Sequence, residues 1–214
     1  MGLKYQGDVF FKYIQPCSPI LAKTVPAGDD WQHEIKFDGF RVQARIIGKT
    51  IELYSRRGSR FSRRFPRLVE VLGELPTRSA IIDGEIVAGD PAGMPDFWPL
   101  FLRSAKPADL HVWAFDLLAL DGKDLRKLPL EARQRRLQVL VRRFDCPVLL
   151  HSEAFDDGEA LLRVAEEHGL EGVVSKRRDA PYSSGACRGW RKVKTMAWRE
   201  ANRERWHMFE TPGR

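Results

Sequence analysis

A short segment of alternating polar and apolar residues, Trp31–Asp38, limits the possible folds of this chain most strictly. Successive side chains of a β-strand point to opposite faces, so one face presents an acid, an amine and an acid: Glu34, Lys36 and Asp38. Gly39 follows and permits a turn or a close approach of the backbone to a ligand. A lysine among such neighbours can act as a nucleophile when its amine is neutral. An exposed edge strand with alternating charges shows the same pattern, so the segment alone leaves both interpretations open.

Length and charge narrow the classes of protein to consider. The 214 residues suffice for one domain with a sizeable core, and the net charge of +7 favours a polyanionic partner, nucleic acid first. The three cysteines are widely spaced and fit no disulfide framework or zinc pattern, which indicates a reducing compartment. No apolar run approaches membrane length and no secretory leader opens the chain, so we expect a cytoplasmic protein.

A second predicted strand carries two acidic residues within an apolar run. The period of Ile81–Val87 places Asp83 and Glu85 on one face. Acidic side chains in such a strand are costly to bury unpaired. A metal ion, a ribose hydroxyl or a basic partner would each offset that cost, and we favour a functional role over a structural salt bridge.

Two further predicted strands bring an acid and a pair of lysines. Glu171 opens an apolar strand, and the last strand, 190–194, places Lys192 and Lys194 on the same face. Two like charges side by side repel each other unless an anion lies between them. If these strands converge with the segment around Lys36, they form a pocket with a nucleophilic amine, acids for a divalent cation and lysines for a triphosphate. Such a pocket could transfer a nucleotidyl group to a lysine.

A basic stretch begins at Ser55 and lies between a predicted strand and a predicted helix over 65–75. A solvated charged surface is the simpler interpretation of such a stretch, but a strand end before a helix also suits phosphate binding. Its arginines are Arg56, Arg57, Arg60, Arg63, Arg64 and Arg67.

The remaining segments predict an antiparallel meander rather than a βαβ unit, together with two helices. The meander covers residues 40–54, a central strand covers 111–118, a helix over 129–143 turns its arginines outward, and Asp156 or Asp157 caps a helix that ends at Gly169. Residues 91–108 are expected to form a loop-rich insertion, and residues 182–185 with 188–189 a flexible loop. We divide the chain into an N-terminal arm (1–18), one domain (19–195) and a basic C-terminal helix and tail (196–214).

Taken together, these segments resemble the adenylation (nucleotidyltransferase) domain of ATP-dependent DNA ligases, most closely the bacterial ligase D type used in non-homologous end joining. The resemblance runs from about Ser18 to Thr195, and a set of motifs in family order is far more specific than any one of them. The motifs are Lys36-Phe37-Asp38-Gly39-Phe40-Arg41, Ser55-Arg56-Arg57-Gly58, Asp83-Gly84-Glu85, Phe115-Asp116-Leu117-Leu118, Glu171-Gly172-Val173-Val174-Ser175-Lys176 and Trp190-Arg191-Lys192-Val193-Lys194.

The resemblance implies a fold and a nucleotide site. The fold would be α+β, the ATP-grasp-like core of DNA ligases and mRNA capping enzymes, with antiparallel sheets flanked by helices. Lys36 would form a covalent lysyl-AMP with ATP. Glu34 would read the edge of the adenine, and Phe115 would stack on its face. Arg41 and Glu85 would meet the ribose.

The resemblance also implies the metal, phosphate and DNA contacts. Glu171, together with Glu85, would hold Mg²⁺ or Mn²⁺, and Lys192 and Lys194 would contact the phosphates. Arg56 would hold the 5′-phosphate of nicked double-stranded DNA, with Arg57 beside it. The implied activity is the sealing of nicks in DNA repair and recombination.

The end of the chain departs from the family pattern. Full ligases continue past the last lysine motif into an oligonucleotide-binding β-barrel, which clamps DNA and carries a basic motif used in self-adenylation. Only residues 195–214 follow that motif here, too few for a five-stranded barrel. We therefore expect a monomeric adenylation domain standing alone, by nature or by truncation, to which a separate protein could supply the clamp.

Other functions share parts of this pattern. RNA ligases and GTP-using capping enzymes have the same lysine motif, and a non-catalytic module that binds nicks or DNA ends could keep the fold without turnover. An NAD-dependent ligase is less well supported, because the four-cysteine zinc module of that class is missing. The matching lysines and acids favour the enzyme, whereas the missing barrel favours the binding module.

Overall fold

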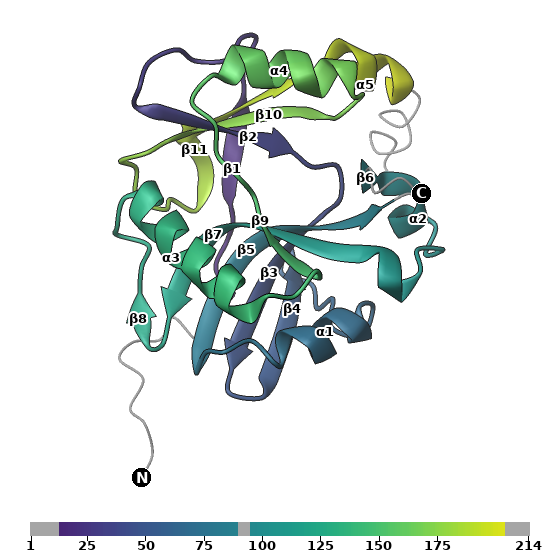
Figure 1. The fold of residues 1–214 in the computed structure, drawn as a ribbon, viewed down its shortest axis with the longest axis vertical. Helices are drawn as coiled ribbons and strands as arrows, with labels where there is room; N and C mark the ends of the chain where they lie inside the picture. Colours follow the sequence, from purple (N-terminus) through teal and green to yellow (C-terminus); the bar gives the residue numbers. More distant parts are fainter. Residues whose placement is uncertain (1–12, 90–94, 204–214) are drawn as a thin grey trace.

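Two β-sheets are stacked with a cleft between them, and helices cover their outer sides (Figure 1). The computed structural model describes residues 13–89 and 95–203. The expected α+β architecture with flanking helices is confirmed. Within the described ranges, no helix combines the length and apolar character needed to cross a bilayer.

The smaller sheet forms the upper layer in Figure 1 and is covered by helix α4 (Gly158–Glu167). Its strands lie in the order β1 (Cys17–Leu21), β11 (Gly185–Lys194), β10 (Gly172–Arg177) and β2 (Trp31–Lys36). All neighbours are antiparallel except β1 and β11. Leu161 of α4 packs in a cluster with Val173 and Ile35 on the outer face, which leaves the alternate residues of β2 and β10 to face the cleft.

The expected capping of α4 is confirmed. Asp157 is the N-cap, and its side chain accepts a hydrogen bond from the backbone N–H of Ala160 at 2.9 Å. Gly169 follows the helix with a φ of +64°, a left-handed conformation that glycine adopts without steric cost.

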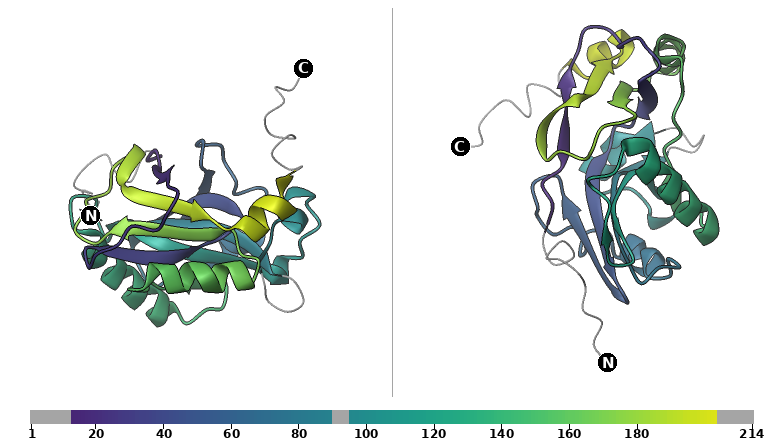
Figure 2. Two further views of the ribbon diagram at one scale, coloured as in Figure 1. Left: turned by 90° about the horizontal axis from the view of Figure 1, so that it is seen from above. Right: turned by 90° about the vertical axis from the view of Figure 1, so that its left-hand side faces the viewer.

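The larger sheet contains the expected antiparallel meander. Its strands lie in the order β4 (Thr50–Ser55), β3 (Phe40–Ile47), β5 (Ser79–Gly89), β7 (Leu110–Leu120) and β8 (Lys123–Asp124), with β6 (Pro95–Asp96) beside β5 and β9 (Leu149–His151) beside β7. Helix α1 (Pro66–Leu72) packs near β4, and α3 (Leu130–Phe144) packs on β7 and β9. The main core lies between this sheet and these helices, and Figure 2 shows the layers from two further directions.

A β-bulge interrupts the pairing of β5 with β7. Asp83 pairs with Asp116 and Gly84 pairs with Ala114, so Phe115 is the extra residue between them. A bulge locally bends and re-aims the strand that contains it. In this chain it brings the Phe115 side chain into the lining of the cleft.

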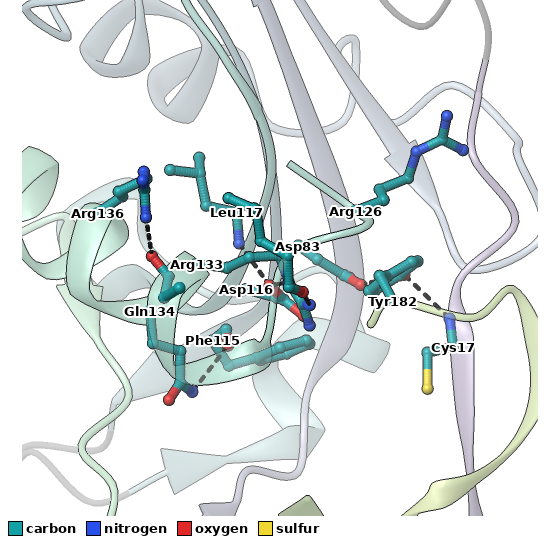
Figure 3. Close-up of polar contacts among 12 residues, drawn as sticks. Cys17, Asp83, Phe115, Asp116, Leu117, Arg126, Arg133, Gln134, Arg136 and Tyr182 are labelled. Atoms are coloured by element: carbon teal, nitrogen blue, oxygen red, sulfur yellow. Dashed lines mark hydrogen bonds and ion pairs between the residues drawn. The ribbon is translucent and has the colours of Figure 1, made fainter. Parts of the chain in front are cut away.

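The prediction that the arginines of α3 point outward is wrong for Arg133. Its guanidinium is fully buried and binds Asp116 through two hydrogen bonds of 2.7 and 2.8 Å, as the two side chains facing each other in Figure 3 show. The same guanidinium donates to the carbonyl oxygens of Leu128 and Ala180. Arg133 thereby neutralises a buried acid and joins α3 to the loop after β10.

We expect Asp116→Asn to destabilise the fold by about 3 to 5 kcal/mol, because it leaves the buried Arg133 charge without a counter-charge. The free energy of unfolding measured by urea denaturation checks this. Glu131→Gln is the matched control, since Glu131 pairs with Arg135 at 3.3 Å on the exposed side of the same helix and should cost at most about 0.5 kcal/mol. Equal costs for the two substitutions would show that the buried pair adds nothing.

The prediction of a flexible loop over 182–185 and 188–189 is also wrong in large part. Residues from Gly185 onward belong to β11, where β1 pairs with them in parallel. Tyr182 is buried, and its hydroxyl donates to Asp83 at 2.6 Å and accepts from the backbone N–H of Cys17 at 3.0 Å (Figure 3). The pairing of β11 with β1 is irregular after Pro19, which explains why β11 lacks a clear alternating pattern in the sequence.

The insertion contains more regular structure than expected, and parts of the insertion and of both ends of the chain lie outside the described residues. The insertion holds β6, helix α2 (Phe97–Phe101) and a 3₁₀ turn, η2 (Pro107–Asp109). The C-terminal helix α5 spans Met196–Ala201, and its expected continuation over 204–209 lies outside the described residues. The same holds for residues 1–12 of the expected arm and 91–94 of the insertion.

Candidate active site

Three rows of paired residues on the inner face of the smaller sheet build one wall of the cleft. The pairing of β2, β10 and β11 brings Lys36, Gly172 and Lys194 into the first row. The second row is Glu34, Val174 and Lys192, and the third is Gln32, Lys176 and Trp190. The expected convergence of the first, fifth and last sequence motifs is therefore a direct consequence of strand register.

Lys36 shares a carboxylate with a second lysine. Its Nζ lies 2.6 Å from Oε2 of Glu171, and Nζ of Lys194 lies 2.9 Å from Oε1 of the same carboxylate. Gly172 makes this approach possible: its φ is +149°, and a Cβ there would lie 2.0 Å from the carbonyl oxygen of Val193. Glu171 thus holds two amines at one end of the cleft, a contact not predicted from the sequence, and its metal binding stays a prediction.

Glu34 lies at the other end of the same strand face and is almost fully buried. Lys176 Nζ lies 2.7 Å from this carboxylate, which also accepts hydrogen bonds from Ser152 Oγ at 2.9 Å and from Gln134 Nε2 at 2.7 Å. Gln134 also donates to the carbonyl oxygen of Phe115 at 3.2 Å. The reading of an adenine edge by Glu34 stays a prediction, and the structure adds that its oxygens already have protein donors.

The larger sheet supplies the opposite wall of the cleft. Phe115 comes from the bulge of β7, and Arg41 and Glu85 are paired neighbours on β3 and β5. The Arg41 guanidinium lies 5.2 Å from the centre of the Phe115 ring and binds Asp83 through two hydrogen bonds of 3.0 and 2.7 Å. Asp83 therefore forms the salt bridge that the sequence had favoured less than a functional role, while a contact of Arg41 with ribose stays a prediction.

The DNA-binding candidates Arg56 and Arg57 are exposed on a tight turn at the end of β4, beside the mouth of the cleft. Ser55 shapes the turn, because its hydroxyl accepts hydrogen bonds from the backbone N–H groups of Arg57 at 3.3 Å and Ser59 at 3.0 Å. Arg64 differs from these two: it packs on the Phe40 ring and donates to a backbone carbonyl, so part of the basic stretch serves the fold.

The cleft between the walls has a volume of about 910 Å³, which is large enough for a nucleotide. All of the predicted nucleotide, metal and nick-phosphate residues line it. They are Glu34, Lys36, Arg41, Arg56, Arg57, Glu85, Phe115, Glu171, Lys192 and Lys194.

Burial in the cleft disfavours the charged forms of one acid and two lysines, and a bound ligand of opposite charge would reduce that cost. Burial raises the pKa of Glu85 to about 8, although Lys36 and Arg41 oppose the shift. Burial lowers the pKa of Lys192, and the positive charge of Lys36 adds to that effect. The pKa of Lys194 is lowered by burial too, against the attraction of Glu171. An anion near the lysines and a cation near the acids would relieve these costs.

The predicted metal ligands, Glu85 and Glu171, suit a cation that is also coordinated by the phosphates of a nucleotide. Among the described residues, no group of three or more His, Cys, Asp and Glu side chains is arranged to hold a metal ion. Glu85 and Glu171 instead offer two carboxylates on opposite walls of the cleft. Mg²⁺ typically keeps several waters and binds one or two carboxylates together with substrate phosphates, so this pair fits such an ion.

Several residues of the cleft had no predicted role. Lys176 is buried with its Nζ 4.6 Å from the centre of the Phe115 ring and 4.3 Å from that of Trp190. Gln134 reaches the site from α3, and Trp198 reaches it from α5. Lys176 was at least part of a sequence motif, as the lysine that ends the apolar strand after Glu171, whereas the helix residues carried no comparable signal.

Solved structures with the same fold define the class of protein. The ligase domain of Mycobacterium tuberculosis LigD matches with a TM-score of 0.73 and 29% sequence identity, covering 85% of this chain and 60% of that one. A mycobacterial DNA ligase D complexed with ATP and MES matches with a TM-score of 0.70 and 30% identity over the same shares. The fold is that of the nucleotidyltransferase domains of ATP-dependent DNA ligases.

The sequence comparison identifies the family. The model of the ATP-dependent DNA ligase domain matches residues 15–194, so this chain belongs to that family. The multifunctional non-homologous end joining protein LigD of Pseudomonas aeruginosa is 33% identical over 88% of this chain and 23% of its own length. The chain spans between 23% and 40% of the curated relatives that it matches, and the similarity to the ligase D type is confirmed.

Proposed function

We propose that this chain is the adenylation half of an ATP-dependent DNA ligase, which forms lysyl-AMP at Lys36 and takes part in sealing nicked DNA. The observation that carries the proposal is the shared carboxylate: Glu171 holds Lys36 and Lys194 within 2.9 Å of its oxygens, on the wall of a cleft of nucleotide size. The family and the ATP-bound mycobacterial ligase D support the same nucleotide.

The cleft offers a separate place for each part of ATP. The base would lie at the deep end against Phe115, beside Glu34 and Lys176. The α-phosphate would then approach Lys36, and Lys192 and Lys194 would neutralise charge that develops on the phosphates. Lys36 would first lose a proton from its ammonium to the Glu171 carboxylate or to water, and the neutral Nζ would then attack the α-phosphorus. A bond from nitrogen to phosphorus would form, the bond to pyrophosphate would break, and the second proton of the amine would pass to solvent.

The proposal includes a divalent cation, Mg²⁺ or Mn²⁺. Glu85 and Glu171 would hold it between the walls, at the phosphate end of the cleft. When bound, it would polarise phosphate oxygens and offset their negative charge as Lys36 approaches. Glu171 would at the same time keep Lys36 and Lys194 aligned, as it does in the structure.

We expect nicked DNA to bind mainly through its phosphates, with Arg56 and Arg57 as the principal contacts. Affinity measured by fluorescence anisotropy should fall steeply with salt, because bound arginines release counterions from DNA. Arg56→Ala with Arg57→Ala should weaken binding and lower the slope of log affinity against log salt by about two, roughly one for each arginine. The control is Arg142→Ala with Arg143→Ala, two exposed arginines on α3. An equal effect of both pairs, or binding that does not depend on salt, would contradict the assignment.

The direct test of the proposed function compares nucleotides. The purified 214-residue protein is incubated with magnesium and with ATP, GTP or NAD, each labelled in the transferable nucleotide, and the covalent protein adduct is measured. An adduct with ATP alone supports the proposal, and an adduct with GTP alone favours a capping-type enzyme. The absence of any adduct, with nicked DNA still bound, favours a non-catalytic nick-binding module.

A further inference from the structure

Helix α5 closes a ring of contacts around Lys36 that involves a tryptophan. The indole Nε1 of Trp198 donates a hydrogen bond of 2.9 Å to Oδ2 of Asp38, two residues after Lys36. The ring of the same tryptophan lies under Lys194, with Nζ 3.9 Å from the ring centre. Since Lys194 and Lys36 share Glu171, Trp198 contacts both sides of the Lys36–Glu171 pair.

The position of Trp198 is fixed independently of the cleft. The carboxylate of Glu166, from α4, accepts hydrogen bonds from the first backbone N–H groups of α5, those of Met196 at 2.8 Å and Ala197 at 2.7 Å. Thr195 caps the helix and donates to the carbonyl oxygen of Leu170 at 2.7 Å. The Trp198 side chain is only 7% exposed. Rigid support of this kind is what a residue needs in order to orient its neighbours.

The two contacts of Trp198 serve different groups. The aromatic face stabilises an ammonium at Lys194, the lysine proposed to contact phosphate. The indole N–H holds Asp38, two residues after Lys36 at the end of β2. This hydrogen bond therefore limits the mobility of the segment that carries the nucleophile. A lysine displaced by about 1 Å from the attack position can lose a factor of roughly 100 in rate.

We propose that Trp198 is a positioning residue for the reaction at Lys36, an assignment that rests on the proposed function. It holds Lys194 through its ring and the Lys36 segment through its indole N–H. Helix α5 is then part of the active site rather than a connection out of the domain.

Two substitutions separate the two contacts. Trp198→Phe keeps an aromatic ring for Lys194 and removes the N–H donated to Asp38. We expect the single-turnover rate constant of lysine adenylation to fall about tenfold, while the ATP concentration for half-maximal rate stays unchanged. Trp198→Ala removes both contacts and should also raise that ATP concentration severalfold. Trp98→Phe, at an exposed tryptophan of α2, is the control for the chemical change.

A second measurement does not depend on adenylation. Brief treatment with acetic anhydride labels accessible amines, and peptide mass spectrometry compares Lys194 with the exposed Lys49. Trp198→Ala should raise the labelling of Lys194 relative to Lys49 at least about threefold, because the ring that covers its amine is gone. Denaturation curves establish that the variants tested are folded.

Different results would overturn the positioning role of Trp198 and the proposed adenylation function. Wild-type rate constants in both Trp198 variants, or unchanged labelling of Lys194, would overturn the positioning role. A wild-type protein that forms no adduct with any nucleotide would overturn the proposed function instead, and the labelling experiment would still decide whether Trp198 holds Lys194.

Discussion

Lys36→Arg is expected to abolish formation of the covalent AMP adduct, reducing it by at least about a thousandfold, the scale of losing a nucleophile. Arginine keeps the positive charge and can still pair with Glu171, but its guanidinium cannot lose a proton and so cannot attack phosphorus. Intact-mass analysis after incubation with ATP and magnesium measures the fraction of protein that carries one AMP. Lys36→Ala should give the same loss.

Lys49→Arg is the matched control, because Lys49 lies on the surface with 80% of its side chain exposed, paired only loosely with Glu74. It should form the adduct as the wild type does. An adduct that persists in Lys36→Arg would show that another nucleophile accepts AMP, with Lys192 and Lys194 the nearest candidates in the cleft.

A nick that already carries 5′-AMP is expected to be sealed at least about tenfold faster than an ordinary nick supplied with ATP. The resemblance to DNA ligases assigns a basic motif of the β-barrel to the first step, and the 214-residue polypeptide is tested without that barrel. Under the proposed function, the final step would depend on groups that line the cleft, chiefly Arg56 for the nick phosphate and the lysines near Glu171. Positioning and electrostatic stabilisation by these groups should suffice for it. Gel separation of the sealed strand measures both rates.

Glu171→Gln should abolish sealing of both substrates, with losses of at least about a hundredfold. The amide keeps the size of the side chain but removes the charge that holds Lys36 and Lys194 and that would help to bind a metal ion. Glu167→Gln, at the end of α4, is a matched control outside the cleft. If the wild type leaves the pre-adenylated nick unsealed while folded and supplied with magnesium, a DNA-binding module becomes the better account.

Strand register made the core of the site predictable from sequence. Alternation in 31–38 and 190–194 correctly identified the residues that line the cleft, because the register of β2, β10 and β11 puts them on one face, while α4 covers the other face of β2 and β10. The polar residues of these strands therefore had to meet wherever the strands paired. The caps of α4 were equally predictable from sequence, because Asp157 and Gly169 affect the backbone only within a few residues of their own positions.

Contacts between distant residues could not be predicted in the same way. Helical periodicity assigns an arginine to the solvent, and nothing near Arg133 indicates that its partner is Asp116 on β7. The carboxylate of Glu34 likewise has its three shortest donor contacts with Gln134, Ser152 and Lys176, each at least 100 residues further along the chain. Such pairs depend on how the sheets and helices stack, which local patterns do not specify.

The first half of β11, before the predicted strand over 190–194, was missed for a related reason. It contains small and polar residues and pairs irregularly with β1, so no alternation marks it. Its stability comes from packing, since Cys187 and Trp190 of β11 lie in a buried cluster with Tyr182 between the two sheets. Tertiary packing rather than intrinsic preference sets this strand.

Mapping the modified residue tests the central claim most directly. Wild-type protein is incubated with ATP and magnesium, digested, and analysed by tandem mass spectrometry under conditions that preserve a phosphoramide bond. Our account predicts AMP on the peptide that contains Lys36, attached to its side-chain nitrogen. AMP attached only to Lys192, Lys194 or another residue, or no modified peptide at all, would contradict the assignment of Lys36 as the nucleophile.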